Sequence, residues 1–205
     1  MHVEFLVEEK SAEAFLAEMV PKITGDMISF RIIRFRGKHD LLKKLPPRLK
    51  GYQKWLPDDY VIIVLIDRDR DDCRILKNRL ERYADDAGLI TKTMARHGES
   101  FQVINRIAVE EIEAWYFGDT NAINKAYPRI PSSVRHKSHY RNPDSVTGGT
   151  WEHLEALFRK FGYYRTGIRK IEVAERISSG MDPEHNRSHS FQIFRDALKE
   201  LIPEI

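Results

Sequence analysis

The stretch YVIIVLIDRDRDDC, residues 60–73, decides how this chain folds. Residues 60–66 form an unbroken apolar run, which is typical of a central strand in a parallel sheet because such a strand is buried on both faces. Asp67, Asp69 and Asp71 follow at alternate positions, with arginines between them. Carboxylates at the end of a buried strand cost free energy unless hydrogen bonds or cations compensate them. The stretch therefore predicts a central strand and a polar site at its carboxyl end.

The sequence on both sides of this strand alternates between strand and helix patterns. Further strands are predicted at residues 3–7, 30–35, 89–95 and 101–109. Helices are predicted at residues 11–23, 39–45, 74–88 and 110–119, and the second of them is expected to be interrupted at Pro46 and Pro47. This alternation predicts an α/β fold with a mostly parallel sheet and helices on both of its faces.

The last third of the chain has a different pattern. Residues 128–149 are rich in Pro, Ser and Gly, which indicates a long loop or hinge. Three helical patterns follow, at residues 150–162, 167–178 and 188–202. We therefore expect an α/β domain over residues 1–127, a loop or hinge over 128–149, and a helical extension over 150–205 that packs on the same domain.

Composition sets the broad class of the protein. The chain has 205 residues, of which 41% are hydrophobic and 32% charged, as in folded globular domains. The longest apolar run is too short to span a bilayer, no secretory signal is visible, and the single cysteine excludes an internal disulfide. These features predict a cytoplasmic protein without a membrane partner. A net charge of +3 permits a nucleic-acid partner without demanding one.

Acidic residues follow several of the predicted strands. Glu8 follows the first strand, Asp67 and Asp69 follow the buried strand, and Glu110, Glu111 and Glu113 follow the last one. The carboxyl ends of parallel strands share one edge of the sheet, so these acids are expected to lie together. Clustered carboxylates repel one another, and a bound divalent cation reverses that repulsion. We therefore predict a Mg²⁺ or Mn²⁺ site in which Asp67 and Asp69 converge on one ion.

Simpler interpretations of the same residues remain open. Asp71 and Asp72 precede a predicted helix and suit its N-terminus as caps. Alternating Arg and Asp residues also occur in solvated loops whose charges pair with each other. Lys38, just after the second strand, is either a phosphate contact or part of a solvated loop. The segment 135–141, with Arg135 and Lys137, is either a nucleic-acid contact or a mobile charged loop.

Four segments carry a resemblance to a known family. They are VEEKSAEAFL from residue 7, RGKHDLLKKL from residue 36, LIDRDRDD from residue 65 and VEEIEAWYFGD from residue 109. The chain resembles a family of small toprim-like bacterial proteins classed as a domain of unknown function. This family is similar to the toprim domain of topoisomerases, primases and overcoming-lysogenisation-defect nucleases. The resemblance covers nearly the whole chain, and Glu9 stands where the family has Gly.

The resemblance implies a set of roles. Glu8 would be an acid/base group or metal ligand, and Asp67 and Asp69 would hold Mg²⁺ with Asp71 as a further ligand. Glu111 would be the third acid, and Glu113, its neighbour in the motif, would be a further metal ligand. The implied activity is phosphodiester cleavage in DNA or RNA, in phage defence with a partner ATPase. The alternative is a non-catalytic subunit that binds such an ATPase or nucleic acid. Cations expected to bind nucleic-acid phosphates are Lys38, Arg135, Lys137, Arg165 and Arg169.

Overall fold

A parallel four-stranded sheet forms the centre of the protein. The computed structural model describes residues 1–164 and 167–202. The strands are β1 (His2–Val7), β2 (Ser29–Arg34), β3 (Tyr60–Asp67) and β4 (Val103–Ala108), in the order β2-β1-β3-β4. All three strand pairs are parallel, so the predicted fold class is confirmed. The chain runs outward from β1 to β2 and then returns to place β3 on the other side of β1. The switch point of the sheet, where ligands of open α/β folds bind, therefore lies between β1 and β3.

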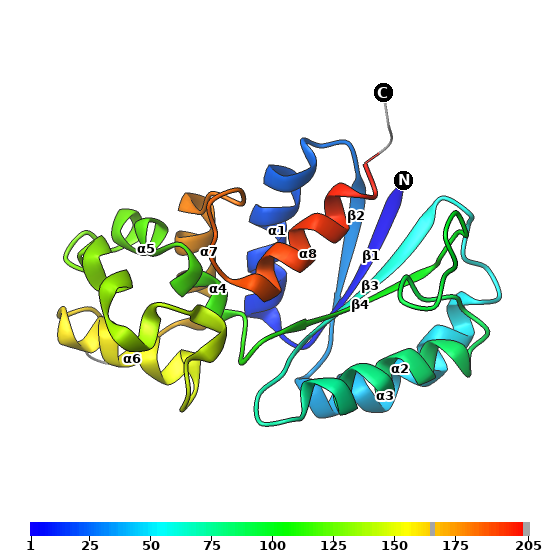
Figure 1. Ribbon diagram of the computed structural model, residues 1–205, viewed down its shortest axis with the longest axis horizontal. Helices are drawn as coiled ribbons and strands as arrows, with labels where there is room; N and C mark the ends of the chain where they lie inside the picture. Colours follow the sequence, from blue (N-terminus) through cyan, green and yellow to red (C-terminus); the bar gives the residue numbers. More distant parts are fainter. Residues whose placement is uncertain (165–166, 203–205) are drawn as a thin grey trace.

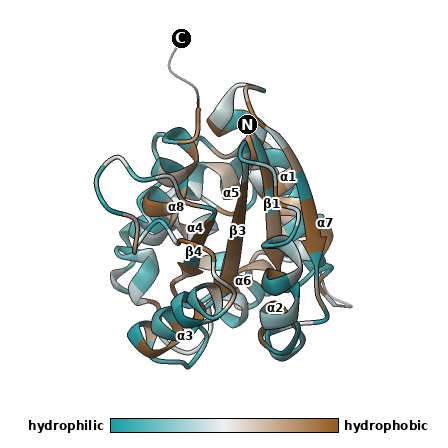
Figure 2. Ribbon diagram, turned by 90° about the vertical axis from the view of Figure 1, so that its right-hand side faces the viewer, coloured by the Kyte–Doolittle hydropathy of each residue, from teal (hydrophilic) through white to brown (hydrophobic). Residues whose placement is uncertain are grey.

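Helices cover both faces of the sheet (Figure 1). Helices α1 (Lys10–Thr24) and α8 (His189–Lys199) lie on one face, and α2 (Lys38–Tyr52) and α3 (Cys73–Asp85) lie on the other. Successive residues of β3 point to opposite faces: Ile63 and Leu65 join the core under α1, and Ile62 and Val64 join the core under α2 and α3. Figure 2 shows this strand as a continuous apolar element among more polar helices. Burial on both faces explains the unbroken apolar run.

The remaining helices lie beside the sheet (Figure 1). They are α4 (Glu113–Gly118), α5 (Thr120–Ala126), α6 (Thr150–Lys160) and α7 (Lys170–Gly180). The predicted loop contains three short 3-10 helices, Ser132–His136, Ser138–Tyr140 and Pro143–Ser145, and it buries Val134, Tyr140 and Val146. No helix in the described part of the chain is long and apolar enough to cross a membrane.

Trp115 of α4 ties the C-terminal helix to the rest of the core. Its ring packs against Phe15 of α1 and against Phe191 and Phe194 of α8, with ring centroids 5.2–5.4 Å apart. Its indole Nε1 donates a hydrogen bond of 2.8 Å to Ser190 Oγ. The apolar ring is packed among other aromatic rings, and its single polar atom has a hydrogen-bond partner. Both conditions are met by a stable, fully buried tryptophan. Residues far apart in the sequence therefore share one core.

Helix α2 runs through both of its prolines, so the predicted interruption at Pro46 and Pro47 is wrong. Proline removes one backbone hydrogen bond and disfavours a helix interior. Here the leucines of α2 recur at helical spacing and are buried against the sheet: Leu41, Leu42, Leu45 and Leu49. Tertiary burial of this apolar face outweighs the local preference of two adjacent prolines.

The predicted strand at residues 89–95 is also wrong. Only Thr91 pairs with the sheet, through a single parallel bridge to Val103. The amides of Met94 and Ala95 both donate to the carbonyl of Thr91, which turns the chain away from the edge. Short apolar runs with β-branched residues predict strands poorly when a turn follows at once.

Candidate functional site

Glu8, Asp67 and Glu113 line one small cavity at the switch point of the sheet. Glu8 follows β1, Asp67 ends β3, and Glu113 begins α4 after the turn that follows β4. Glu8 Oε1 accepts a hydrogen bond of 2.7 Å from the backbone N–H of Asp67. Asp67 Oδ1 accepts one of 3.1 Å from the N–H of Ile112. The cavity holds about 10 Å³, room for one water-sized group.

The three carboxyl groups are held in an environment that disfavours their charge. Burial raises the pKa of Glu8 to about 7. The hydrogen bond from the backbone of Asp67 lowers this pKa, and the charge of Asp69 raises it further. Burial also raises the pKa of Glu113 to about 7. The pKa of Asp67 lies well above its ordinary value because of burial and of the charges of Glu8 and Glu113. Burial is the largest cause in all three groups, and the charges of Lys38 near Glu8 and of Lys170 near Glu113 offset it only in part.

Tyr116 adds an unused polar atom to this region. Its hydroxyl is buried and has no hydrogen-bond partner among the described residues. Burial, followed by the charges of Glu113 and Asp67, raises the pKa of Tyr116 well above its ordinary value. A buried hydroxyl without a partner is unfavourable, so a water or ligand atom close to it would stabilise the site.

The other two acids of the Asp-x-Asp-x-Asp stretch face Lys38 at the start of α2. Lys38 Nζ donates to the carbonyls of Asp67 and Arg68 at 2.7 and 2.9 Å. It also lies 3.1 Å from Asp69 Oδ2 and 2.7 Å from Asp71 Oδ2. Burial lowers the pKa of Lys38, but the hydrogen bonds to Asp71 and Asp69 outweigh this and raise it. The ammonium group of Lys38 therefore neutralises the charge of the Asp69 and Asp71 carboxylates in this loop.

Replacing Lys38 with methionine tests this neutralisation. Asp69 and Asp71 would lose their partner, so we expect a loss of roughly 1–3 kcal/mol of stability in metal-free buffer. Mg²⁺ or Mn²⁺ should restore most of the melting temperature, because the ion can then neutralise the same carboxylates. Thermal melts with and without metal measure this. Lys44→Met, which breaks an exposed pair with Asp40, is the matched control. Equal melts for both variants would contradict a special role for Lys38.

Backbone conformation separates the acids into two neighbouring cavities. Asp69 and Glu110 both have positive φ angles, 49° and 62°, and the N–H of Asp69 donates to the carbonyl of Glu110 at 2.8 Å. Asp69, Glu110 and Glu111 line a second cavity of about 220 Å³ with Gly148, Gly149 and Glu152. Glu110 pairs with Arg68. Of the three acids after β4, Glu113 is therefore the one that shares a cavity with Glu8 and Asp67.

Glu111 lies at the N-terminus of α6. Its Oε2 accepts hydrogen bonds from Thr150 Oγ1 at 2.9 Å and from the N–H of Trp151 at 2.8 Å. A carboxylate in this position satisfies a backbone donor that has no partner within the helix. The structure gives Glu111 a capping interaction, and its role as the third acid stays a prediction.

Replacing Glu111 with alanine should lower stability by roughly 1–2 kcal/mol, because the N-terminus of α6 loses its acceptor. The melting temperature should fall by about 2–8 °C for a chain of this size, with or without Mg²⁺. Glu175→Ala, at an exposed acid in the middle of α7, is the control. Unchanged metal-free stability together with a lost response to Mg²⁺ would instead identify Glu111 as a metal ligand.

Lys170 is a cation of this site that the sequence did not reveal. Its Nζ lies 3.6 Å from Glu9 Oε1 and 4.7 Å from the centroid of the Trp151 ring. Burial lowers the pKa of Lys170, but the charges of Glu113, Glu9 and Glu111 outweigh this and raise it. Lys170 lies far from the acidic motifs in the sequence, on a helix with an ordinary amphipathic pattern, so no local signal identifies it.

The oxygen atoms at this site are of the chemical type that binds a hard divalent cation. They are carboxylate oxygens with a tyrosine hydroxyl nearby, and Mg²⁺ and Mn²⁺ prefer such oxygen ligands. Within the described residues, no three His, Cys, Asp or Glu side chains are already grouped closely enough to hold a metal ion. Glu8, Asp67 and Glu113, which line the same cavity, are the residues that would hold such an ion.

The basic residues predicted to bind nucleic acid are dispersed. Arg135 is exposed and donates from Nε to His136 at 3.3 Å, and Lys137 Nζ lies 6.0 Å from the Tyr140 ring. Arg169 is exposed directly before Lys170, at the border of the acidic site. Arg165 lies outside the described residues. Of the remaining four predicted cations, Lys38 pairs with Asp69. Arg169 precedes Lys170 in the sequence, and Lys170 is the cation that contacts Glu9.

Comparison with known proteins places the chain in a family. The chain is similar to the C-terminal region of the Xanthomonas campestris pv. campestris OLD protein, with 17% identity, 96% of this chain and 93% of that chain covered, and a TM-score of 0.42. Curated proteins gave no match. A family model described as "Domain of unknown function (DUF4276)" matches residues 7–199. This agrees with the family resemblance of the four sequence segments. The chain belongs to the DUF4276 family.

Proposed function

We propose that this protein is a divalent-metal-dependent phosphodiesterase that cleaves DNA or RNA. The observation that supports it best is the meeting of Glu8, Asp67 and Glu113 in one cavity at the switch point, with the pKa of each carboxyl group raised. A structural role alone does not require three such groups to lie together, because each repels the others. The resemblance of the acidic segments to toprim motifs supports the same chemistry.

The residues would divide the work of phosphodiester hydrolysis. A bound Mg²⁺ or Mn²⁺ would supply Lewis acidity toward the phosphate and the attacking water. Glu8 has one carboxylate oxygen that does not accept from the N–H of Asp67, and this oxygen would suit proton transfer from that water. Lys170, and Arg169 next to it, would contact the phosphate backbone at the border of the site. Lys38 would hold the Asp69 turn in position.

The direct test is cleavage by the purified chain. Supercoiled plasmid, single-stranded DNA and RNA should each be incubated with the protein in Mg²⁺ or Mn²⁺, and a chelator should abolish any cleavage. The assay should be repeated with a partner ATPase, where one is encoded nearby. Cleavage that persists unchanged in an Asp67→Asn preparation would identify a contaminating nuclease and contradict the proposal.

One observation favours a second candidate function. Lys38 already neutralises Asp69 and Asp71 from within, and no group of three ligands is preassembled among the described residues. Both features suit a non-catalytic subunit that binds a partner ATPase or nucleic acid. This alternative would be supported if the folded wild-type protein cleaves none of the substrates with either metal, whether alone or with its partner.

A further inference from the structure

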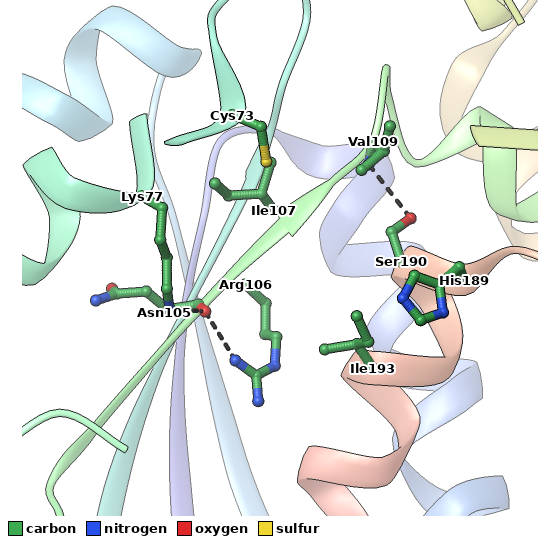
Figure 3. A pocket seen from close by; sticks show the side chains of 9 residues that line it. All are labelled: Cys73, Lys77, Asn105, Arg106, Ile107, Val109, His189, Ser190 and Ile193. Carbon is green, nitrogen blue, oxygen red and sulfur yellow. Dashed lines mark hydrogen bonds between the residues drawn. The ribbon is translucent and has the colours of Figure 1, made fainter. Parts of the chain in front are cut away.

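A larger cavity, of about 320 Å³, lies outside the acidic site along the open edge of β4 (Figure 3). Its size is at the lower end of the range for small-molecule sites, about 300–1,000 Å³. Most of its surface is apolar, and it lies between α3 and α8. The side chains that matter here come from three elements: Cys73 and Lys77 of α3, Arg106 and Ile107 of β4, and His189 and Ile193 of α8.

Arg106 brings an unneutralised positive charge into this cavity. The guanidinium is half-buried, and its Nη1 donates to the carbonyl of Asn105 at 3.0 Å. Its Nε is buried and has no hydrogen-bond partner, and no carboxylate of the described residues forms an ion pair with it. The nearby acids are engaged elsewhere, since Glu81 pairs with Lys77 and Glu200 pairs with Lys92. A buried charge in this state is unfavourable, and an anion in the cavity would stabilise it.

The edge of β4 adds a free backbone donor and acceptor. The carbonyls of residues 102 and 108 accept hydrogen bonds from β3 and the turn after it, so the odd-numbered residues between them face the open edge. The carbonyl of Asn105 is taken by Lys77 Nζ at 2.9 Å, and the N–H of Val109 by Ser190 Oγ at 3.3 Å. Between them, the N–H and C=O of Ile107 face the cavity without a partner among the described residues.

These three features together select a class of ligand. Inorganic phosphate would neutralise Arg106 but would leave the apolar walls in water. An aliphatic carboxylate would cover those walls but would leave the Ile107 backbone unsatisfied. A nucleotide supplies an anion, a flat apolar body, and a heterocycle edge that carries both hydrogen-bond donors and acceptors.

We propose that this cavity binds one nucleotide unit. The base lies between Ile193 and the Cys73 side of the groove and is read by the backbone of Ile107. The phosphate lies against the guanidinium of Arg106, which has no carboxylate partner among the described residues. The unit is either a free mononucleotide or one nucleotide of a single strand. The proposal does not depend on hydrolysis at the acidic site.

Cys73 provides a reporter, because it is the single cysteine of the chain and lines the cavity. The full chain, in metal-free buffer, is labelled with a small thiol reagent in the presence of AMP, GMP, CMP or UMP. At least one of them should slow the labelling of Cys73 in a saturable way, with a Kd of about 1 mM or tighter. A 5′-phosphorylated trinucleotide that binds at least tenfold more tightly than any mononucleotide would identify a strand as the source, and the reverse would identify a free nucleotide.

Two variants make the test specific. Arg106→Gln should weaken nucleotide binding by about tenfold or more, since a charged hydrogen-bond donor is lost. Arg79→Gln, which removes the same charge from the exposed side of α3, should bind as wild type. If Arg106→Gln does not fold, Ile193→Glu, at a partly exposed position of the wall, should block binding instead.

Three outcomes would overturn the proposal: no protection of Cys73 by any nucleotide or trinucleotide, equal protection by inorganic phosphate, or unchanged affinity in both variants. Asp67→Asn should bind nucleotide like wild type. Nucleotide binding and phosphodiester cleavage can therefore fail independently.

Discussion

The Asp67→Asn protein is expected to lose Mn²⁺-dependent cleavage by a factor of about a thousand or more while it remains folded. Asparagine keeps an oxygen that can accept the hydrogen bond from Ile112, so the turn after β4 keeps its anchor. The substitution removes the charge that would hold the metal, and a metal that acts mainly in the transition state affects rate far more than substrate affinity. Cleavage rates at saturating substrate, together with binding measured in Ca²⁺, separate the two effects.

A matched control and a stability measurement complete this prediction. Asp58→Asn changes an exposed acid in the loop before β3, at the opposite edge of the sheet from Asp67, and should cleave as wild type. In metal-free buffer, Asp67→Asn should melt at or above the wild-type temperature, because it relieves repulsion from Glu8 and Glu113. A large loss of stability in all buffers would show that Asp67 is needed for the fold rather than for chemistry.

Metal-free stability is expected to fall as pH rises from about 5 to about 8. Glu8 and Glu113 have a pKa of about 7 in the folded protein and an ordinary value of 4.5. Between these values the folded state keeps protons that the unfolded chain has released, so stability decreases with rising pH. The loss should be on the order of a few kcal/mol, with a fall of about 5–10 °C in melting temperature.

Two comparisons isolate this effect from the titration of other groups. The double variant Glu8→Gln with Glu113→Gln cannot release these protons, so its melting temperature should vary less with pH than that of wild type. Mg²⁺ should stabilise wild type most at pH 8, where the carboxylates are ionised in the metal-bound state. Melting curves at a series of pH values, with metal or with chelator, measure both. Parallel pH profiles for wild type and the double variant would contradict the raised pKa values.

The sequence predicts the sheet well because its strongest pattern, the apolar run of the central strand, results from burial in the folded structure. The run from residue 60 to 66 is apolar at every position since β3 is buried on both faces, and few surroundings besides the middle of a parallel sheet favour so short and unbroken a run. Pro46 and Pro47 mislead for the opposite reason: their local preference is overcome by leucines whose burial depends on the completed fold. Residues 89–95 fail as a strand because the chain turns after Thr91, whose carbonyl accepts hydrogen bonds from the amides of Met94 and Ala95.

The candidate site was predictable in composition but not in arrangement. Strand order along the sequence indicates that Glu8 and Asp67 end at one edge. The positive φ angle of Glu110 determines which of the acids after β4 lies beside Glu8 and Asp67. A glutamate does not predict a positive φ angle, so the sequence gives no signal of this turn. The cation Lys170 arrives from α7 through packing alone. The family resemblance identifies the acidic segments, whereas the pairing of Lys38 with Asp69 and Asp71 emerges only from the folded structure.

The hydrogen bond from Trp115 to Ser190 has a consequence for how the protein is made. The two residues are 75 positions apart. At a synthesis rate of about 5–20 residues per second, Ser190 is added roughly 4–15 s after Trp115. Until then the Trp115 indole has no Ser190 to bind, and the segment that carries Glu113 lacks the packing of Phe191 and Phe194. The acids of the site therefore reach their final positions only after α8 has been synthesised.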